Sequence, residues 1–230
     1  MRIYKNFLKR LFDLFFSFLV LILLSPVFLI VAIAIKLETP GPVIFKQTRL
    51  GRHGKPFTIY KFRSMCVDAE NKGSGQYSFK GDPRVTKVGR VIRATSIDEL
   101  PQLINIIKGD MSLIGFRPPL TYHPWPFEDY DDEQRKMFEV RPGVTGWAQI
   151  HGRKDVMWVD RINMGVYYAE HVSFLLDLRI FFITIWKVLS NADNENKNIT
   201  IEKKSNSKTT VITENIDDES ETNSKDNIEK

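Results

Sequence analysis

The segment LFFSFLVLILLSPVFLIVAIAI, residues 14–35, contains 22 consecutive residues without a charged side chain. As an α-helix, a run of this length crosses ~30 Å of hydrocarbon, so the segment is predicted to enter a membrane. Ser25 and Pro26 lie in its middle. Pro26 lacks the amide that would bond to the carbonyl of Ile22, and the Ser25 hydroxyl can bond to nearby backbone groups. The pair therefore predicts a sharp bend halfway along the segment.

Basic residues flank this segment on both sides. They are Arg2, Lys5, Lys9 and Arg10 before it, and Lys36, Lys46, Arg49, Arg52 and Lys55 after it. Because Lys and Arg favour the cytoplasmic side of a membrane, both ends are expected in the cytoplasm. The sequence therefore favours a re-entrant helix-break-helix over residues 1–38, which enters and leaves by the same face. A simple membrane span is the alternative.

The net charge of +5 is unevenly distributed along the 230 residues. Residues 191–230 hold 6 Lys and 10 Asp or Glu but no Phe, Trp or Tyr, a composition that predicts a disordered tail. Residues 1–190 then carry a net charge of +9, which points to anionic partners such as phosphates, phospholipid or nucleic acid. The single cysteine, Cys66, excludes an internal disulfide and indicates a reducing compartment.

Residues 39–190 are predicted to form a small cytoplasmic domain of the α/β class, or helix-rich α+β. Residues 41–65 alternate like two strands with a turn near GRHGKP. Residues 128–138 resemble a short solvated helix. In residues 172–189 the apolar side chains recur at helical spacing, so this segment is either an amphipathic helix at a membrane interface or a core helix.

Two adjacent carboxylates, Asp98 and Glu99, stand just before Pro101 and an apolar run. Ser96 and Glu99 have the spacing of a capping box, which predicts a helix that begins near Asp98 and ends at Gly109. Acidic residues in a first helical turn also suit the helix dipole. From this motif alone, helix capping and a reaction centre both remain open.

Many basic residues surround the acidic pair in the sequence: Lys61, Arg63, Arg84, Lys87, Arg90, Arg93, Arg117, Arg141 and Arg153. Several arginines adjoin glycine or proline, in GFRPP, VRPGVTGW and IHGR, where turns can hold a donor toward an anion. Arginine clusters bind phosphate, and carboxylates bordered by cations suit phosphoryl transfer with a divalent metal. A solvated or lipid-facing basic surface is the alternative. The sequence contains no P-loop, no G-x-G-x-x-G after a strand and no H-E-x-x-H motif.

The chain resembles the bacterial sugar transferases, in particular the small monotopic polyprenyl-phosphate phosphoglycosyl transferases that begin the assembly of capsules, exopolysaccharides and other glycoconjugates. The resemblance rests on KRLFD (9–13), the Ser25-Pro26 step, IYKFRSM (59–65), IRATSIDELPQLINIIKGDMSLIGFRP (92–118), VRPGVTGWAQIHGR (140–153) and SFLLDLRIFF (173–182). It implies a monotopic membrane protein with a re-entrant hairpin, interfacial helices and a cytoplasmic catalytic domain. The expected location is the cytoplasmic face of the bacterial inner membrane.

The resemblance also implies a reaction. Asp98 would attack the β-phosphorus of a UDP-sugar, release UMP and pass the sugar phosphate to polyprenyl (undecaprenyl) phosphate. Asp98 and Glu99 would hold Mg²⁺. Basic positions of the family motifs would neutralise phosphate charge; they are Lys61, Arg93, Arg117 and Arg153. Arg63 and Arg141, from the basic cluster, are further candidates for binding phosphate or substrate.

Other interpretations stay open. A membrane-tethered protein that binds anions without catalysis, a scaffold that has lost activity, and a direct attack by the lipid phosphate with Asp98 as a base are the alternatives. The aromatic-plus-basic modules that bind nucleic acid are not evident. Homodimerisation and association with other glycan-assembly enzymes are possible, and the sugar cannot be read from the sequence. Two positions depart from the family pattern, GFRPP where G-P-R-P is commoner, and Gly165 where many relatives carry an acidic residue.

Overall fold

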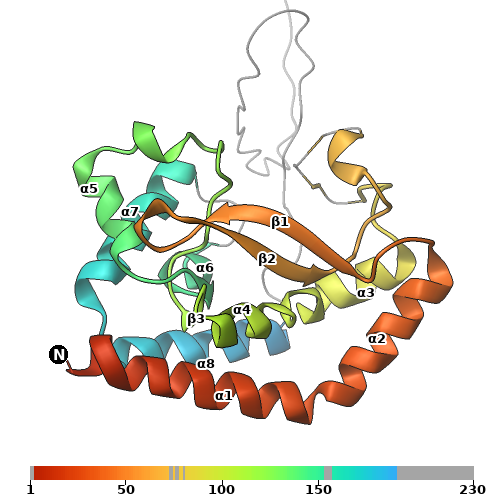
Figure 1. Cartoon of the computed structure of the whole chain (residues 1–230), viewed down its shortest axis with the longest axis horizontal. Helices are drawn as coiled ribbons and strands as arrows, with labels where there is room; N and C mark the ends of the chain where they lie inside the picture. Colours follow the sequence, from red (N-terminus) through yellow and green to blue (C-terminus); the bar gives the residue numbers. More distant parts are fainter. Residues whose placement is uncertain (1–2, 73–74, 76–77, 80, 153–156, 191–230) are drawn as a thin grey trace, which may run out of the picture.

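The computed structural model describes residues 3–72, 75, 78–79, 81–152 and 157–190, and within them the protein is a helix-rich α/β structure with two small sheets (Figure 1). The longer helices are α1 (Lys9–Leu23), α2 (Ser25–Glu38), α3 (Lys87–Ala94), α4 (Gln102–Lys108), α7 (Trp158–His171) and α8 (Phe174–Ser190). The shorter helices are α5 (Asp132–Arg135) and α6 (Trp147–Ile150). The strands are β1 (Ile44–Leu50), β2 (Pro56–Phe62), β3 (Ser112–Ile114) and β4 (Gly143–Thr145).

The apolar segment forms two helices, α1 and α2, which meet at an angle of 61°. The break follows from local chemistry. Pro26 lies in the first turn of α2, and the Ser25 hydroxyl donates a 2.8 Å hydrogen bond to the carbonyl of Ile22, the carbonyl that Pro26 cannot serve. The predicted bend is therefore present. Among the described helices none alone is long and apolar enough to cross a membrane. The bent pair of α1 and α2 together has the length and the apolar composition that a crossing requires.

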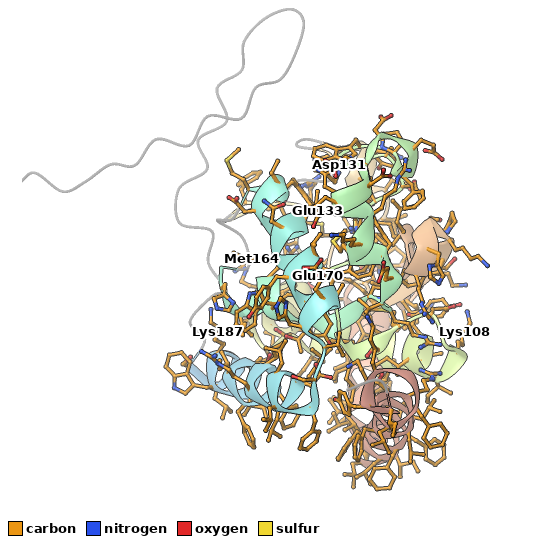
Figure 2. All side chains as sticks on the ribbon, turned by 90° about the vertical axis from the view of Figure 1, so that its left-hand side faces the viewer. Lys108, Asp131, Glu133, Met164, Glu170 and Lys187 are labelled. Atoms are coloured by element: carbon orange, nitrogen blue, oxygen red, sulfur yellow. The ribbon has the colours of Figure 1, made fainter. Side chains whose placement is uncertain are left out.

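Helices α1 and α8 lie side by side and form an apolar base (Figures 1 and 2). Its exposed side chains include Leu11, Phe15, Phe18, Ile22 and Leu23 of α1, and Phe174, Leu175, Phe181, Phe182, Trp186 and Leu189 of α8. The opposite face of α8 is buried, with Ile180 in the main core. The core interpretation of residues 172–189 thus holds for the buried face of α8, and a membrane interface at its exposed apolar face stays a prediction. The acidic Asp131 and Glu133 lie at the far end of the molecule (Figure 2).

The N-terminal end of α1 is fastened to α8 by a buried carboxylate. Asp177 accepts hydrogen bonds from Lys9 (2.7 Å), Tyr4 (2.6 Å) and Tyr168 (2.7 Å). Burial and the charge of Asp177 raise the pKa of the Tyr168 hydroxyl above its usual range, so this group stays a donor. These contacts hold the apolar base to the rest of the protein.

Strands β1 and β2 form the predicted antiparallel hairpin, with Ile44 opposite Phe62 and Leu50 opposite Pro56. Its turn passes through residues 52–54, within the GRHGKP segment. The second sheet pairs β3 with β4 in parallel, Ser112 beside Gly143 and Ile114 beside Thr145. This sheet is not predicted from the sequence, because three-residue strands carry too little periodicity. The predicted helix at 128–138 is divided into α5 and flanking 3₁₀ turns.

The main core explains both departures from the family pattern. Phe116, the unusual residue of GFRPP, is 2% exposed, and its ring packs edge-on against Phe138 at 5.2 Å. Gly165 is buried in α7, where an added Cβ would lie 2.5 Å from the sulfur of Met137. An acidic side chain at position 165 would therefore displace Met137 from this core. Both residues serve packing in this chain.

Candidate active site

Asp98 and Glu99 lie in a 3₁₀ turn, Ile97–Glu99, between α3 and α4. The predicted capping box is wrong: Ser96 adopts a left-handed conformation (φ 57°) and makes no capping hydrogen bond to this turn, and α4 begins only at Gln102. The predicted end of the helix is confirmed. Gly109 has φ 98°, and the amides of Gly109 and Asp110 bond back to the last turn of α4. The acidic pair thus precedes the helix instead of starting it.

Glu99 is buried between two cations that come from distant parts of the chain. Its Oε1 accepts a 2.9 Å hydrogen bond from the Lys61 ammonium of β2, and an Arg117 guanidinium nitrogen lies 3.5 Å from the same oxygen. The Glu99 side chain is 9% exposed. Burying a carboxylate is costly unless it is paired in this way. The half-buried Asp98, which precedes it, also acts electrostatically on Lys61.

Burial lowers the pKa of Lys61 below its usual 10.5; Glu99 opposes this shift, while Arg117 adds to it. A further cation, Arg49 of β1, lies close enough to interact electrostatically with both Arg117 and Glu99. Burial and the nearby Arg117 lower the pKa of Arg49 to about 10. Its side chain donates to Gln47 and to the carbonyl of Pro118, at 3.2 Å. From the sequence, Arg49 is predicted only as a charge that flanks the apolar segment, although its place among the exposed basic residues of the hairpin was a usable signal.

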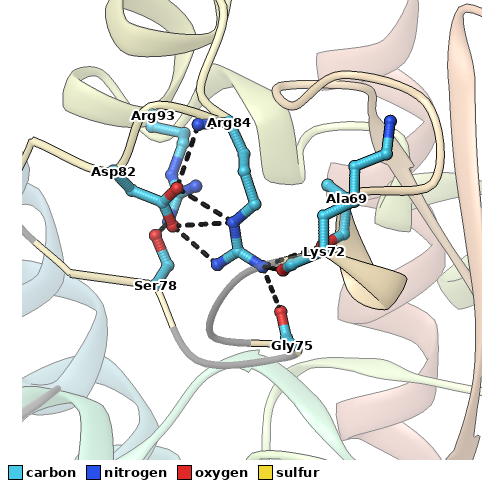
Figure 3. Close-up of polar contacts among 7 residues, drawn as sticks. All are labelled: Ala69, Lys72, Gly75, Ser78, Asp82, Arg84 and Arg93. Atoms are coloured by element: carbon cyan, nitrogen blue, oxygen red, sulfur yellow. Dashed lines mark hydrogen bonds and ion pairs between the residues drawn. The ribbon is translucent and has the colours of Figure 1, made fainter. Parts of the chain in front are cut away.

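Arg93, in the last turn of α3, donates a 3.0 Å hydrogen bond to Ser78 in the loop before α3. That loop is organised by the buried Arg84 (Figure 3). The Arg84 guanidinium pairs with Asp82 at 2.7 Å and donates to backbone carbonyls of the loop, which are those of Ala69, Lys72 and Gly75. Arg84 therefore stabilises the loop that contacts Arg93.

The other predicted phosphate ligands have different positions. Arg63 is 5% exposed and donates to the carbonyls of Thr39 (2.8 Å) and Pro40 (2.5 Å), which ties the end of α2 to β2. Arg141 donates to the carbonyl of Gly109 at 2.9 Å, at the end of α4 opposite the acidic pair. Burial and Arg10 lower the pKa of Arg141. The structure thus brings Lys61 and Arg117 to Glu99 and gives Arg63 and Arg141 contacts with backbone. Arg153 lies outside the described residues.

The α6 segment approaches the Arg117 loop closely. A Cβ on Gly146 would lie 1.8 Å from the carbonyl oxygen of Gly115, two residues before Arg117. Gln149 is buried here, and neither atom of its amide has a hydrogen-bond partner within the described part of the chain. The absence of a side chain at Gly146 is therefore what allows the two backbones to meet.

Within the described residues, no group of three or more His, Cys, Asp or Glu side chains is placed to hold a metal ion. The adjacent carboxylates of Asp98 and Glu99 nevertheless fit Mg²⁺, because this ion is commonly held by one or two carboxylates together with substrate phosphates and water. Zinc, which prefers His and Cys ligands, fits this site poorly.

An acidic pair flanked by Lys61, Arg117 and Arg49 suits phosphoryl transfer, because cations offset phosphate charge. The family comparison agrees with this class. The chain belongs to the bacterial sugar transferase family, whose model matches residues 4–191.

Relatives within the family include small and large proteins. The chain is 44% identical to the uncharacterized sugar transferase EpsL of Bacillus subtilis strain 168, over 85% of this chain and 95% of that protein. It is 42% identical to the UDP-glucose:undecaprenyl-phosphate glucose-1-phosphate transferase of Escherichia coli K12, over 81% of this chain. It is 44% identical to the UDP-N-acetylgalactosamine-undecaprenyl-phosphate N-acetylgalactosaminephosphotransferase of Aeromonas hydrophila, over 80% of this chain. The chain matches only 41% and 44% of the lengths of the last two.

Proposed function

We propose that the protein transfers a sugar-1-phosphate from a UDP-sugar to polyprenyl phosphate and releases UMP, as the first membrane step of glycan assembly. The observation that carries this proposal is the acidic pair in which Glu99 is held by Lys61 and Arg117. The names of the E. coli and A. hydrophila relatives give this reaction with two different sugars. The proposal therefore covers the reaction and leaves the sugar open.

In the proposed mechanism, a carboxylate oxygen of Asp98 attacks the β-phosphorus of the UDP-sugar. The bond between this phosphorus and the bridging oxygen breaks, and UMP leaves with that oxygen and its electron pair. A phosphate oxygen of the polyprenyl phosphate then attacks the phosphorus of the sugar phosphate on Asp98, which restores the carboxylate and forms the diphosphate bond. Such a two-step route lets a water-soluble donor and a lipid acceptor react in turn at one nucleophile.

Lys61, Arg117 and Arg49 offset the negative charge that a carboxylate meets on approaching a diphosphate. Arg93 is a fourth cation for this role, because it lies in the last turn of α3, just before the turn that holds Asp98. Mg²⁺, when bound by Asp98 and Glu99, would supply further charge neutralisation at the diphosphate. Glu99 has a second task, since its pairing with Lys61 and Arg117 fixes both cations beside the nucleophile.

The same proposal places the protein on the cytoplasmic face of the bacterial inner membrane, with α1 and α2 as a re-entrant hairpin. The bent helix pair and the exposed apolar side chains of α1 and α8 support it. Apolar surface of this extent is unfavourable in water, which supports contact of this face with lipid. A nucleophile close to this apolar surface would meet the phosphate of a lipid whose chain stays in the bilayer.

The proposal is tested by UMP release from a panel of UDP-sugars, with the protein in nanodiscs. We expect turnover with one or a few sugars, dependent on added undecaprenyl phosphate, lost with EDTA and restored by Mg²⁺. Without the lipid acceptor, intact-mass measurement should detect an increase of one sugar phosphate. Turnover without a trapped adduct would support direct attack by the lipid. If the full panel yields no UMP, the anion-binding scaffold becomes the better interpretation.

The lowered pKa of Lys61 predicts a pH dependence. Because this ammonium loses its proton at a lower pH than a free lysine, the KM for the UDP-sugar should rise on the alkaline side before pH 10.5 is reached. Lys61→Arg should move that rise to higher pH, since a guanidinium keeps its charge. The measurement is the pH profile of KM, with the exposed Lys55→Arg as control. Identical profiles for Lys61→Arg and wild type would contradict this prediction.

A further inference from the structure

Another buried carboxylate, Asp13, lies in α1 one turn past Lys9, and the proposed reaction does not use it. Asp13 is 4% exposed although it lies on a helix whose other face is apolar and exposed. Its Oδ2 accepts a 2.6 Å hydrogen bond from the Ser112 hydroxyl, and its Oδ1 accepts a 3.0 Å bond from the amide of Leu113. Both partners belong to β3, so one side chain joins the apolar base to the parallel sheet.

The backbone of β3 explains why a hydrogen-bond acceptor is needed here. Within β3, the amide of Ser112 bonds to the carbonyl of Pro142, the residue before β4. Successive amides of a strand point to opposite sides, so the amide of Leu113 points away from β4. A buried amide without a partner is strongly unfavourable. Asp13 supplies the acceptor that a third strand would otherwise provide.

This strand leads directly to the candidate active site. After β3 the chain passes through Gly115 and Phe116, which is anchored in the core against Phe138. The next residue is Arg117, whose guanidinium lies 3.5 Å from Glu99. Only three residues, 114–116, therefore separate the amide held by Asp13 from the arginine at the acidic pair, and all three are buried.

We propose that Asp13 is a positioning residue for Arg117, so that the apolar helix α1 sets the place of this cation beside Glu99 in addition to contacting lipid. The inference rests on the proposed function for its kinetic readout. Without the Asp13 acceptor, the amide of Leu113 loses its hydrogen bond and β3 can shift. The Arg117 guanidinium is then no longer held at a fixed distance from Glu99. Arg117 touches the reacting groups in this scheme, whereas Asp13 acts only through β3.

A double-mutant cycle of Asp13→Ala and Arg117→Ala tests the coupling, with kcat and KM for UMP release measured in nanodiscs. We expect Asp13→Ala alone to lower kcat/KM about 10-fold and to add less than about 3-fold when Arg117 is already alanine, as for residues coupled in one network. Equal losses in both backgrounds would overturn the inference. Asp13→Asn keeps an acceptor oxygen for the Leu113 amide and should recover most of the activity.

A control lies one turn away on the same helix. Ser17 is 0% exposed, and its hydroxyl has no hydrogen-bond partner within the described residues. Ser17→Ala should therefore retain wild-type kinetics. If Asp13→Ala does not fold, the cycle is run with Ser112→Ala, which removes only the hydroxyl contact and should give a smaller loss with the same dependence on Arg117.

Hydrogen exchange provides a readout that does not need the proposed reaction. Asp13→Ala should speed amide exchange in the peptide that spans residues 112–118, while Ser17→Ala should leave it unchanged. Unchanged exchange in Asp13→Ala would overturn the inference even in an active enzyme. Faster exchange in a protein that releases no UMP from any donor would instead uphold the structural link and reject the proposed function.

Discussion

Asp98→Asn is expected to abolish turnover, with UMP release at least about 10³-fold below wild type, because an amide cannot replace a carboxylate nucleophile. Asn keeps the size of the side chain, and the neighbouring Glu99 keeps its contacts with Lys61 and Arg117. The variant should therefore fold and bind the UDP-sugar. It should also fail to gain the mass of one sugar phosphate when the lipid acceptor is left out.

The control is Asp110→Asn, which removes a carboxylate just beyond the other end of α4. Asp110 pairs with the exposed Lys108 at 3.4 Å and lies away from the acidic pair. The activity of the Asp110→Asn variant should stay near that of the wild type, because a surface ion pair contributes little to stability. Near-normal turnover in Asp98→Asn would exclude Asp98 as the nucleophile. A large loss in Asp98→Asn with the adduct still present would assign the nucleophile to another residue.

Gly89→Ala is expected to destabilise the protein by ~3 kcal/mol, the upper range for overpacking of a buried site. Gly89 lies in α3, and an added Cβ would stand 1.9 Å from the carbonyl oxygen of Ser64. The obstacle is backbone, so α3 itself would have to shift. A glycine-to-alanine change inside a helix normally stabilises by ~0.5–1 kcal/mol, so the predicted sign is opposite to the helix-propensity effect.

Thermal unfolding in detergent measures this effect, and a loss of ~3 kcal/mol should lower Tm by about 6–12 °C. Activity should fall as well, because α3 carries Arg93 and leads into the turn that holds Asp98. Arg90→Ala is the control, since the exposed neighbour of Gly89 should change stability by less than ~0.5 kcal/mol. A Gly89→Ala protein as stable as wild type would show that α3 can move away from Ser64 at little cost.

Three parts of the structure followed from local sequence because their causes are local. The bend between α1 and α2 needs only the missing amide of Pro26 and the hydroxyl of the neighbouring residue, Ser25. The β1–β2 hairpin needs only alternation and a glycine-containing turn. The end of α4 at Gly109 belongs to the same group, since a left-handed residue closes the helix. Such features are decided within a few residues.

The capping interpretation of Ser96 and Glu99 failed for a complementary reason. The spacing of the two residues suits a capping box, yet Glu99 is 38 residues from Lys61 in sequence and only 2.9 Å from it in space. The Glu99 carboxylate pairs with Lys61 of β2 and Arg117 of the loop after β3 instead of capping a helix. A buried carboxylate without a charged partner is more unfavourable than a helix start without a cap. Local spacing contains no information about such a competitor.

By itself, the sequence determined the bent apolar segment, the hairpin, the carboxylate pair and the family. Only the tertiary structure decided which cations serve the pair: Lys61 and Arg117 lie at Glu99, Arg49 joins them, and Arg63 and Arg141 bind backbone elsewhere. It also decided that Asp13 of the apolar helix meets β3. The physical reason is that helix bends and turns arise from bonded neighbours, whereas the partner of a buried charge is chosen by how distant segments pack.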